Sequence, residues 1–246
     1  MHLITAFCSF NIGAEMNGST ATRPPSSSVG DYLKAICEVG GSGAASTKDV
    51  ADRLSISSAS VSNMFVRLRE MGLAEYERYQ GASLTEAGRE EALRLVRRHR
   101  LIETFLLEHL GYSWREVHEE AERLEHAVSD EFTERLAEFL GHPDHDPHGD
   151  PIPAADGTLE PDDSFPLAAA AVGQRVRISR VDHRGADVLA FLEERGLLPG
   201  RLAEIKEVRA VDGVVSVEDE DGELHSLGRA LADSIFVRSV PEGIDY

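Results

Sequence analysis

Two neighbouring segments, residues 98–103 (RHRLIE) and 114–126 (WREVHEEAERLEH), carry histidine and glutamate at helical spacing. If both segments are helical, each set lies on one face, because positions three, four and seven apart point the same way. Imidazole nitrogens and carboxylate oxygens gathered on one face are ligands for a divalent metal ion. Acidic helices that contain a histidine are common, but two such sets in succession favour a metal site over ordinary surface charge. The candidate ligands are His99, Glu103, His118, Glu122, Glu125 and His126.

The composition is that of a soluble globular protein and excludes several other classes. The chain has 246 residues, of which 41% are hydrophobic and 28% charged, so it can hold one large domain or two to three small ones. No apolar run reaches the length of a membrane span, and we expect no membrane partner. The only cysteines are Cys8 and Cys37, which excludes a disulfide framework and favours a cytoplasmic location.

The net charge of −19 is unevenly distributed along the chain. Residues 29–105 contain 11 basic and 11 acidic residues, whereas residues 106–246 contain 13 basic and 32 acidic residues. The neutral part can bind nucleic acid even though the whole chain is acidic. Bound cations would partly neutralise the acidic remainder.

Residues 1–28 predict a disordered leader. The apolar stretch 3–10 is short and lacks a basic flank, and a run rich in Ser and Pro follows it, so a signal peptide is the weaker interpretation. Met16 is an alternative start of the chain. At the other end, residues 241–246 form a short tail.

Residues 29–92 predict a winged helix-turn-helix domain. Apolar residues recur at helical spacing in 29–39, 46–54 and 59–71, and 73–85 has the pattern of a β-hairpin. Two short helices joined by a tight turn, with a hairpin after them, favour DNA binding over a plain three-helix bundle with a serine-rich surface. Asn63 can hydrogen-bond a base edge, and the arginines can reach phosphates. The predicted DNA contacts are Ser57, Ala59, Ser60, Ser62, Asn63, Arg67, Arg69 and Arg78.

Residues 93–140 predict a helical metal-binding and dimerisation domain. A long helix over 86–110 is followed by helices over 118–126 and 129–140. Their apolar residues exceed what one helical hairpin can hide, which indicates an intersubunit interface, although a purely internal core is the alternative.

The composition of residues 141–167 predicts a linker, and the apolar pattern of residues 168–240 predicts a small SH3-like barrel. Proline at this density excludes helix and sheet, and we expect the three histidines and three aspartates of 142–150 to be solvated rather than metal-binding. Beyond it the period of the apolar pattern changes to two, with strands expected over 174–181, 202–208, 214–218 and 235–240. We expect a short helix over 186–195, between the first and second of these strands. A further segment, 224–227, lies between the third and fourth strands.

Taken in this order, the segments resemble the diphtheria toxin repressor family, which are bacterial metal-dependent transcriptional regulators. The resemblance is carried by 98–103, 114–126 and PHGDPIP at 147–153, and it covers nearly all of 29–240. The barrel, with GLLPG at 196–200, also resembles the small domain of ferrous-iron transport proteins. The family implies a mainly α fold with a β C-terminal domain, a homodimer, a palindromic operator in double-stranded DNA, and no small-molecule substrate.

The resemblance also implies how the ligands are divided. One site would consist of Asp31, Glu122, Glu125 and His126, and the second of His99, Glu103 and His118. Iron-responsive members add ligands from the first strand of the barrel, where this chain has Arg180 and His183; arginine cannot ligate a metal, so Asp182 or His183 is the expected substitute.

The identity of the metal follows from two further positions. Iron-sensing members have methionine where this chain has Asp31 and cysteine where it has Glu122. Hard carboxylates in place of sulfur favour Mn²⁺, with Fe²⁺ as the alternative. The compact manganese-responsive members have glutamate at the position of Lys34 and lack the barrel, so the number of metal ions stays open.

Metal-gated DNA binding is therefore the predicted function, because Asp31 belongs to one domain and its partner ligands to another. A hydrolase with a dinuclear centre of His99, Glu103, His118 and Glu122 is the alternative from another class. No further nucleophile or acid–base residue converges on that cluster, which argues against it. A winged-helix regulator of an unrelated ligand is the third interpretation.

Overall fold

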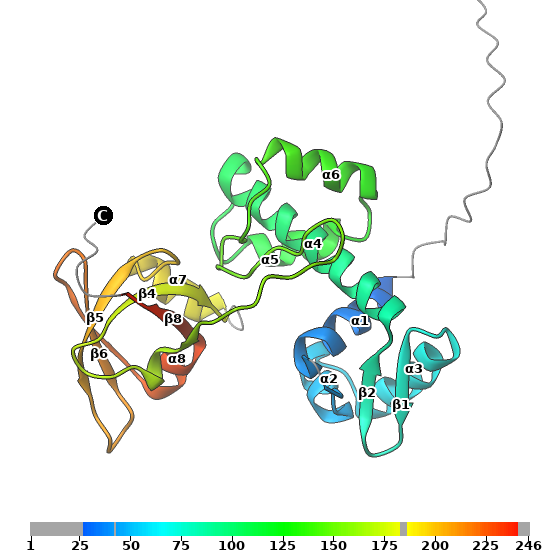
Figure 1. Cartoon of the computed structure of the whole chain (residues 1–246), viewed down its shortest axis with the longest axis horizontal. Helices are drawn as coiled ribbons and strands as arrows, with labels where there is room; N and C mark the ends of the chain where they lie inside the picture. The colour runs from blue at the N-terminus through cyan, green and yellow to red at the C-terminus, as the bar shows by residue number, and fades with distance from the viewer. Residues whose placement is uncertain (1–26, 42, 183–185, 241–246) are drawn as a thin grey trace, which may run out of the picture.

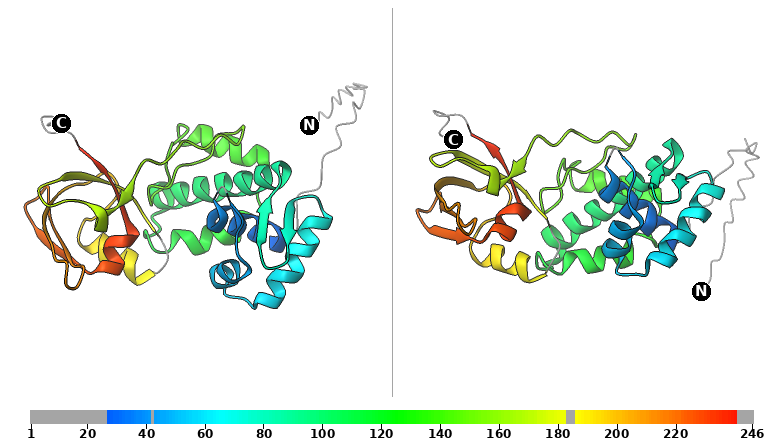
Figure 2. Two further views of the ribbon diagram at one scale, coloured as in Figure 1. Left: turned by 60° about the horizontal axis from the view of Figure 1, so that its bottom comes forward. Right: turned by 90° about the horizontal axis from the view of Figure 1, so that it is seen from below.

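A computed structural model of the chain describes residues 27–41, 43–182 and 186–240. Three bodies follow one another along the chain: an N-terminal domain of helices and a hairpin, a central helical domain, and a C-terminal β-barrel (Figures 1 and 2). Residues 1–26 of the expected leader, the alternative start at Met16 and the expected tail at 241–246 lie outside the described residues, whereas residues 27 and 28, also expected in the leader, begin the first helix. Within them, no helix is long and apolar enough to cross a membrane.

The N-terminal domain has the predicted winged helix-turn-helix order. It consists of α1 (Ser27–Gly40), α2 (Thr47–Leu54), α3 (Ser58–Glu70), β1 (Ala74–Glu77) and β2 (Gly81–Leu84). Ser46 caps α2 by accepting from the Asp49 amide, and Ser57 caps α3 by accepting from the Ser60 amide. Between the two helices Ser55 adopts a left-handed conformation (φ 54°), which makes the tight turn. The strands pair antiparallel, and Leu33, Phe65 and Leu68 are buried beneath them.

The central domain is built on one long helix, α4 (Glu86–Leu110), with α5 (Val117–Leu124) and α6 (Asp130–Phe139) packed against it (Figure 1). The N-terminal half of α4 contributes Ala92 to the core of the first domain, and its C-terminal half contributes Leu101 and Ile102 to the core of the second. Helix α5 ends two residues earlier than predicted, so Glu125 and His126 lie in the turn that follows it.

The prediction that 141–167 is a solvated linker was wrong for its first part. Asp146 and His148 are 7% and 0% exposed. The segment 145–151, called the His148 loop below, is held by several hydrogen bonds: Asp146 Oδ1 accepts the His148 and Asp150 amides, and Trp114 Nε1 donates to the Pro147 carbonyl oxygen. Arg100 on α4 donates to the Pro151 carbonyl oxygen. Proline prevents regular secondary structure in this segment, but the hydrogen bonds to its backbone hold it in a fixed irregular conformation.

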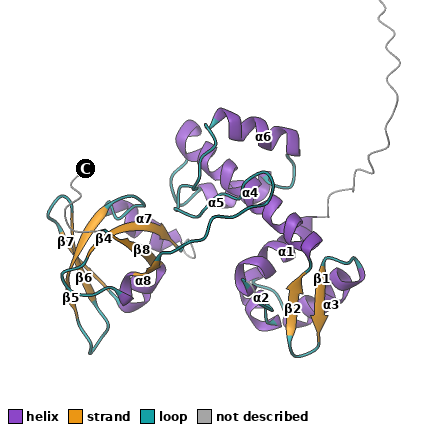
Figure 3. Cartoon of the chain, in the orientation of Figure 1, coloured by secondary structure: helices purple, strands orange, loops and turns teal. Residues whose placement is uncertain are grey.

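The C-terminal domain is a six-stranded antiparallel sheet curled around an apolar core, as Figure 3 shows by its strands. The strand order is β3-β8-β4-β5-β6-β7, and breaks in register at Ile178/Arg180 and Ile205/Glu207 bend the sheet. Four predicted strands are confirmed, and the segment 224–227 is a fifth. The elements are β3 (Phe165–Pro166), η1 (Leu167–Ala169), β4 (Arg175–Val181), α7 (Ala186–Glu194), β5 (Leu202–Val208), β6 (Val215–Asp219), β7 (Leu224–Leu227), α8 (Arg229–Ser234) and β8 (Ile235–Ser239).

The barrel is attached to the central domain through the His148 loop. The Val181 amide on β4 donates to the His148 carbonyl oxygen at 2.9 Å. Gly149 lies so close to β4 that an added Cβ would overlap the Ser179 carbonyl oxygen and approach the Arg180 Cα to 2.7 Å. Arg180 also holds the chain that leads into the barrel, since its Nε donates to Asp162 Oδ2 at 2.7 Å.

Replacing Asp162 by asparagine should weaken this attachment at neutral pH and much less in acid. Burial by itself raises the pKa of Asp162, but hydrogen bonds from Ser164 and Arg180 outweigh it and lower the pKa to about 2, from an ordinary value of 3.8. Ionised Asp162 therefore stabilises the fold above about pH 4, and this contribution is lost as the pH falls towards 2. We expect Asp162→Asn to cost about 1 kcal/mol at pH 7, a small value because the carboxylate is partly open to solvent.

Urea unfolding of both proteins at pH 7 and pH 3 measures this effect. The difference in the free energy of unfolding between wild type and variant should be smaller at pH 3 than at pH 7. Asp163→Asn is the matched control, because Asp163 is its exposed neighbour and pairs with Arg238 rather than Arg180. A difference that is independent of pH would contradict the assignment.

Candidate metal centre and nucleic-acid interface

Imidazole and carboxylate side chains form a continuous network where α1, α4, α5 and the His148 loop meet. Three groups within it could each hold a metal ion, because their ligand atoms lie within 4.8 Å of one another. A cavity of about 260 Å³ opens onto the network from the side of α1, and Asp31, His118 and Glu122 line part of its wall. Every potential ligand atom in the three groups is nitrogen or oxygen.

The first group joins two domains. Asp31 comes from α1, whereas Glu125 and His126 come from the turn after α5. His126 Nε2 lies 2.7 Å from Asp31 Oδ1 and 3.4 Å from Glu125 Oε1. Glu125 is completely buried, while Asp31 and His126 are partly open to solvent. We call this set the interdomain group.

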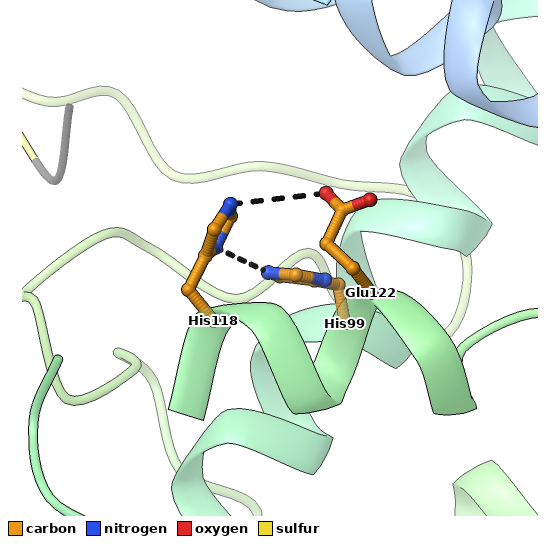
Figure 4. Close-up of side chains that lie close together, drawn as sticks. All are labelled: His99, His118 and Glu122. Carbon is orange, nitrogen blue, oxygen red and sulfur yellow. Dashed lines mark hydrogen bonds and ion pairs between the residues drawn. The ribbon is translucent and has the colours of Figure 1, made fainter. Parts of the chain in front are cut away.

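The second group lies between α4 and α5 and consists of His99, His118 and Glu122, whose side chains converge in Figure 4. His99 Nε2 is 3.1 Å from His118 Nδ1, and His118 Nε2 is 3.8 Å from Glu122 Oε1. The i, i+4 spacing of His118 and Glu122 places both on the face of α5 that covers α4.

The third group, Glu103, Asp146 and His148, was not predicted. All three side chains are buried, and His148 Nδ1 lies 3.8 Å from Glu103 Oε2. Trp114 stacks on the imidazole with ring centroids 5.3 Å apart and fixes its plane. The only sequence signal for His148 was its place in the PHGDPIP motif, because no periodicity relates the loop to α4.

His99 connects the three groups. Its Nδ1 is 2.5 Å from Glu125 Oε2, and its Nε2 is 2.9 Å from Glu103 Oε1. Burial disfavours a charged imidazole, but Glu103 and then Glu125 outweigh this effect and raise the pKa of His99 to about 9. The same contact, together with His118 and His148 nearby, overcomes the burial of Glu103 and holds its pKa well below the usual range. The two side chains thus form a buried ion pair.

Lys34 is the unexpected member of the network. It lies on α1 one turn after Asp31 and is only 5% exposed. Its Nζ donates to Glu122 Oε1 at 2.7 Å and to the two carboxylate oxygens of Glu125 at 2.9 and 3.1 Å. Burial disfavours the ammonium form, but the two carboxylates outweigh burial and raise the pKa of Lys34.

The groups differ in part from the ligand sets that the family resemblance implied. Asp31, Glu125 and His126 do lie together, but Glu122 lies with His99 and His118 rather than with them. In the described part of the barrel the expected substitute Asp182 belongs to none of the groups, and Arg180, which cannot ligate a metal, pairs with Asp162. His183 lies outside the described residues.

The donors fit a divalent ion of intermediate or hard character. Carboxylate oxygen and imidazole nitrogen suit Mn²⁺, Fe²⁺ and Zn²⁺ alike, and the absence of sulfur from these three groups removes the ligands that select soft metals. His99 Nδ1 contacts Glu125 Oε2 and His148 Nε2 contacts the Trp114 carbonyl oxygen, and these partners orient the two rings.

The residues predicted to contact DNA belong to α3, its N-cap and the turn of the β1–β2 hairpin, and Figure 3 shows α3 beside this hairpin. Asn63, Arg67 and Arg69 are exposed on α3, on the side away from buried Phe65 and Leu68. Arg78 lies at the hairpin tip, beside the 92% exposed ring of Tyr79. The first turn of α3 presents the remaining candidates, which are Ser57, Ala59, Ser60 and the partly buried Ser62.

Asn63→Ala and Arg67→Ala should weaken DNA binding in different ways. If Asn63 contacts a base edge, its loss costs about 1–3 kcal/mol on the operator and little on unrelated DNA. If Arg67 contacts a phosphate, its loss weakens both to the same extent and lowers the slope of log K against log salt by about 1. Fluorescence anisotropy at several salt concentrations separates the two effects. Equal losses on both DNAs for Asn63→Ala would contradict base contact.

Comparison with known proteins matches all three bodies to described domains. Residues 26–82 match the iron dependent repressor N-terminal DNA binding domain, 85–154 its metal binding and dimerisation domain, and 165–239 the FeoA domain. The diphtheria toxin repressor of Corynebacterium diphtheriae is 33% identical over 159 residues, which are 61% of this chain and 70% of that protein. The chain belongs to the diphtheria toxin repressor family.

Two further members of the family differ in the metal that their names give. A manganese-dependent transcriptional repressor in complex with manganese is 38% identical, with a TM-score of 0.80 over 86% of this chain and all of that one. The iron-dependent repressor IdeR of Mycobacterium tuberculosis is 39% identical over 104 residues, which are 42% of this chain and 45% of that protein.

Membership of the diphtheria toxin repressor family confirms the predicted fold class and the predicted function as a metal-dependent DNA-binding transcriptional regulator. The family consists of DNA-binding repressors rather than enzymes, so the dinuclear hydrolase was the wrong alternative. A winged-helix regulator of an unrelated ligand class is likewise excluded by the match to the metal binding domain.

Proposed function

We propose that this repressor is cytoplasmic and responds to manganese, and that the interdomain group is where the metal controls DNA binding. The observation that carries the proposal is that one group takes Asp31 from the DNA-binding domain and both Glu125 and His126 from the central domain. A ligand shared by two domains favours the one arrangement in which its donors converge.

The choice of manganese rests on the type of donor. Asp31 and Glu122 offer carboxylate oxygens, and the other side chains of the network offer oxygen or imidazole nitrogen. Mn²⁺ prefers such ligands, whereas sulfur would favour softer ions. Fe²⁺ uses the same donors and is the second candidate, which the iron-dependent relative supports.

A divalent ion bound to the interdomain group supplies positive charge to which carboxylates of both domains are attracted. Asp31 then fixes α1 against the turn that follows α5. Since α1 packs in the same core as α3 through Leu33 and Phe65, the recognition helix follows α1. Allosteric coupling of this kind typically changes affinity about 5–150-fold.

We propose further that the chain is a homodimer that binds a palindromic operator. An aromatic surface on the central domain supports this: Phe139 is 63% exposed and contacts Phe105 and His109, with ring centroids 6.0 and 4.9 Å apart. Phe132 and Leu110 are further exposed apolar side chains of the central domain. Apolar surface of this extent is typical of an intersubunit contact, and two-fold symmetry of the protein requires matching half-sites in the DNA.

An anaerobic titration of metals against binding to the DNA upstream of the protein's own coding sequence tests the proposal. We expect Mn²⁺ to strengthen operator binding at lower free concentration than Fe²⁺ or Zn²⁺, with no effect on unrelated DNA. A stronger response to Fe²⁺ would replace manganese by iron, and DNA binding that no metal changes would refute metal control.

A further inference from the structure

We propose that Lys34 is a built-in cation that restricts the carboxylate cluster of Asp31, Glu122 and Glu125 to a single divalent ion. The inference deepens the proposed function and rests on it. Lysine is rarely buried, because its ammonium group is strongly hydrated. At 5% exposure, with three hydrogen bonds to two glutamates, Lys34 takes the position between carboxylates that a metal ion would otherwise fill.

The geometry divides the cluster into two halves. Lys34 Nζ lies between Glu122 and Glu125, and both oxygens of Glu125 accept from it. Asp31 and His126 contact each other at 2.7 Å, and His126 Nε2 lies 3.4 Å from Glu125 Oε1. The ammonium group of Lys34 therefore occupies the position between Glu122 and Glu125. Asp31 and His126 remain available to an added metal ion.

The charges agree with this division. Asp31, Glu122 and Glu125 carry three negative charges, and Lys34 brings the cluster to a net charge of minus two. One divalent ion neutralises that charge completely. A second ion would bring two further positive charges close to a buried ammonium group, where like charges repel strongly because the surroundings are poorly screened.

Lys34 also cannot easily move aside. Its side chain is 7% exposed, and Glu125, its bidentate partner, is fully buried. Removal of the ammonium would leave the Glu125 carboxylate with His99 and His126 as its remaining side-chain contacts among those described. The lysine thus connects α1 to the end of α5 independently of Asp31.

The number of Mn²⁺ ions bound by each chain tests the inference, measured by native mass spectrometry and calorimetry on the full-length protein. Lys34→Met removes the charge but keeps the length of the side chain, and Lys34→Arg keeps the charge. We expect Lys34→Met to bind one more Mn²⁺ per chain than the wild type, and to bind the first ion about tenfold more tightly. Lys34→Arg should bind the same number as the wild type.

Close pairs of Mn²⁺ also broaden the six-line electron paramagnetic resonance spectrum of an isolated ion, so Lys34→Met should show this broadening and Lys34→Arg should not. Circular dichroism establishes that each variant is folded. An unchanged ion count in folded Lys34→Met, or an added ion in Lys34→Arg, would overturn the role of Lys34 and leave metal control intact. A wild type that binds no Mn²⁺ and shows no metal-dependent DNA binding would overturn both.

Discussion

Asp31→Ala is expected to abolish the response of DNA binding to Mn²⁺ while the protein stays a dimer. Asp31 is the contribution of the N-terminal domain to the interdomain group, and its Oδ1 lies 2.7 Å from His126 Nε2. Without it the remaining members of that group all belong to the central domain, so a bound ion no longer favours one arrangement of the two domains. The whole coupling of about 5–150-fold should disappear.

Glu38→Ala is the matched control for this experiment. Glu38 is a carboxylate on the same helix and pairs with Arg53, and it belongs to none of the metal-ligand groups among the described residues. Gel-shift titrations with and without Mn²⁺ measure the response, and sedimentation measures the dimer. If Asp31→Ala keeps the wild-type response to Mn²⁺, the interdomain group is not where the metal acts.

Gly149→Ala is expected to release the barrel from the central domain. Gly149 has a φ of 87°, which is strained for alanine, and an added Cβ would overlap the Ser179 carbonyl oxygen on β4. The loop and the strand cannot both keep their positions, so the hydrogen bond from the Val181 amide to His148 should break. We expect a cost of about 3 kcal/mol, of which the unfavourable φ accounts for about 1 kcal/mol.

Gly157→Ala is the control that measures the effect of the unfavourable φ without a steric overlap. Gly157 has a similar φ of 81°, but an added Cβ would meet only one side-chain atom, 4.0 Å away. Hydrogen exchange at the Val181 amide should accelerate at least about tenfold in Gly149→Ala and stay slow in Gly157→Ala. Small-angle scattering should show a larger radius of gyration for Gly149→Ala alone. Equal behaviour of the two variants would mean that the His148 loop does not hold the barrel.

Local sequence signals predicted most of the fold. The period of the apolar residues placed the helices within a few residues, and the structure shows Ser46 and Ser57 capping α2 and α3. The two-residue strand β3 and the six-residue helix α8 are too short to produce a periodic signal, and they were not predicted. Their stability comes from the barrel that they complete rather than from their own sequence.

The metal centre was predictable where its ligands share a helix and not where they meet across the fold. The spacing of His99 and Glu103 on α4 was sufficient to place them together. The burial of His148 depends on Trp114, 34 residues earlier, and on a strand that begins 27 residues later. Lys34 meets Glu125 across 91 residues, and nothing in its local sequence distinguishes it from the exposed lysines that are the rule.

Helix α4 has a mechanical consequence for how this repressor reads DNA. Its 25 residues extend about 38 Å and run without interruption from the core of the DNA-binding domain into the core of the central domain. The continuous helix therefore connects the two domains rigidly, with no flexible hinge along its length. If the end of α4 in the central domain tilts by only about 5°, its end in the DNA-binding domain moves by about 3 Å. The distance between the two recognition helices of a dimer can thus be set by very small rotations, which side-chain contacts at α1 are sufficient to hold.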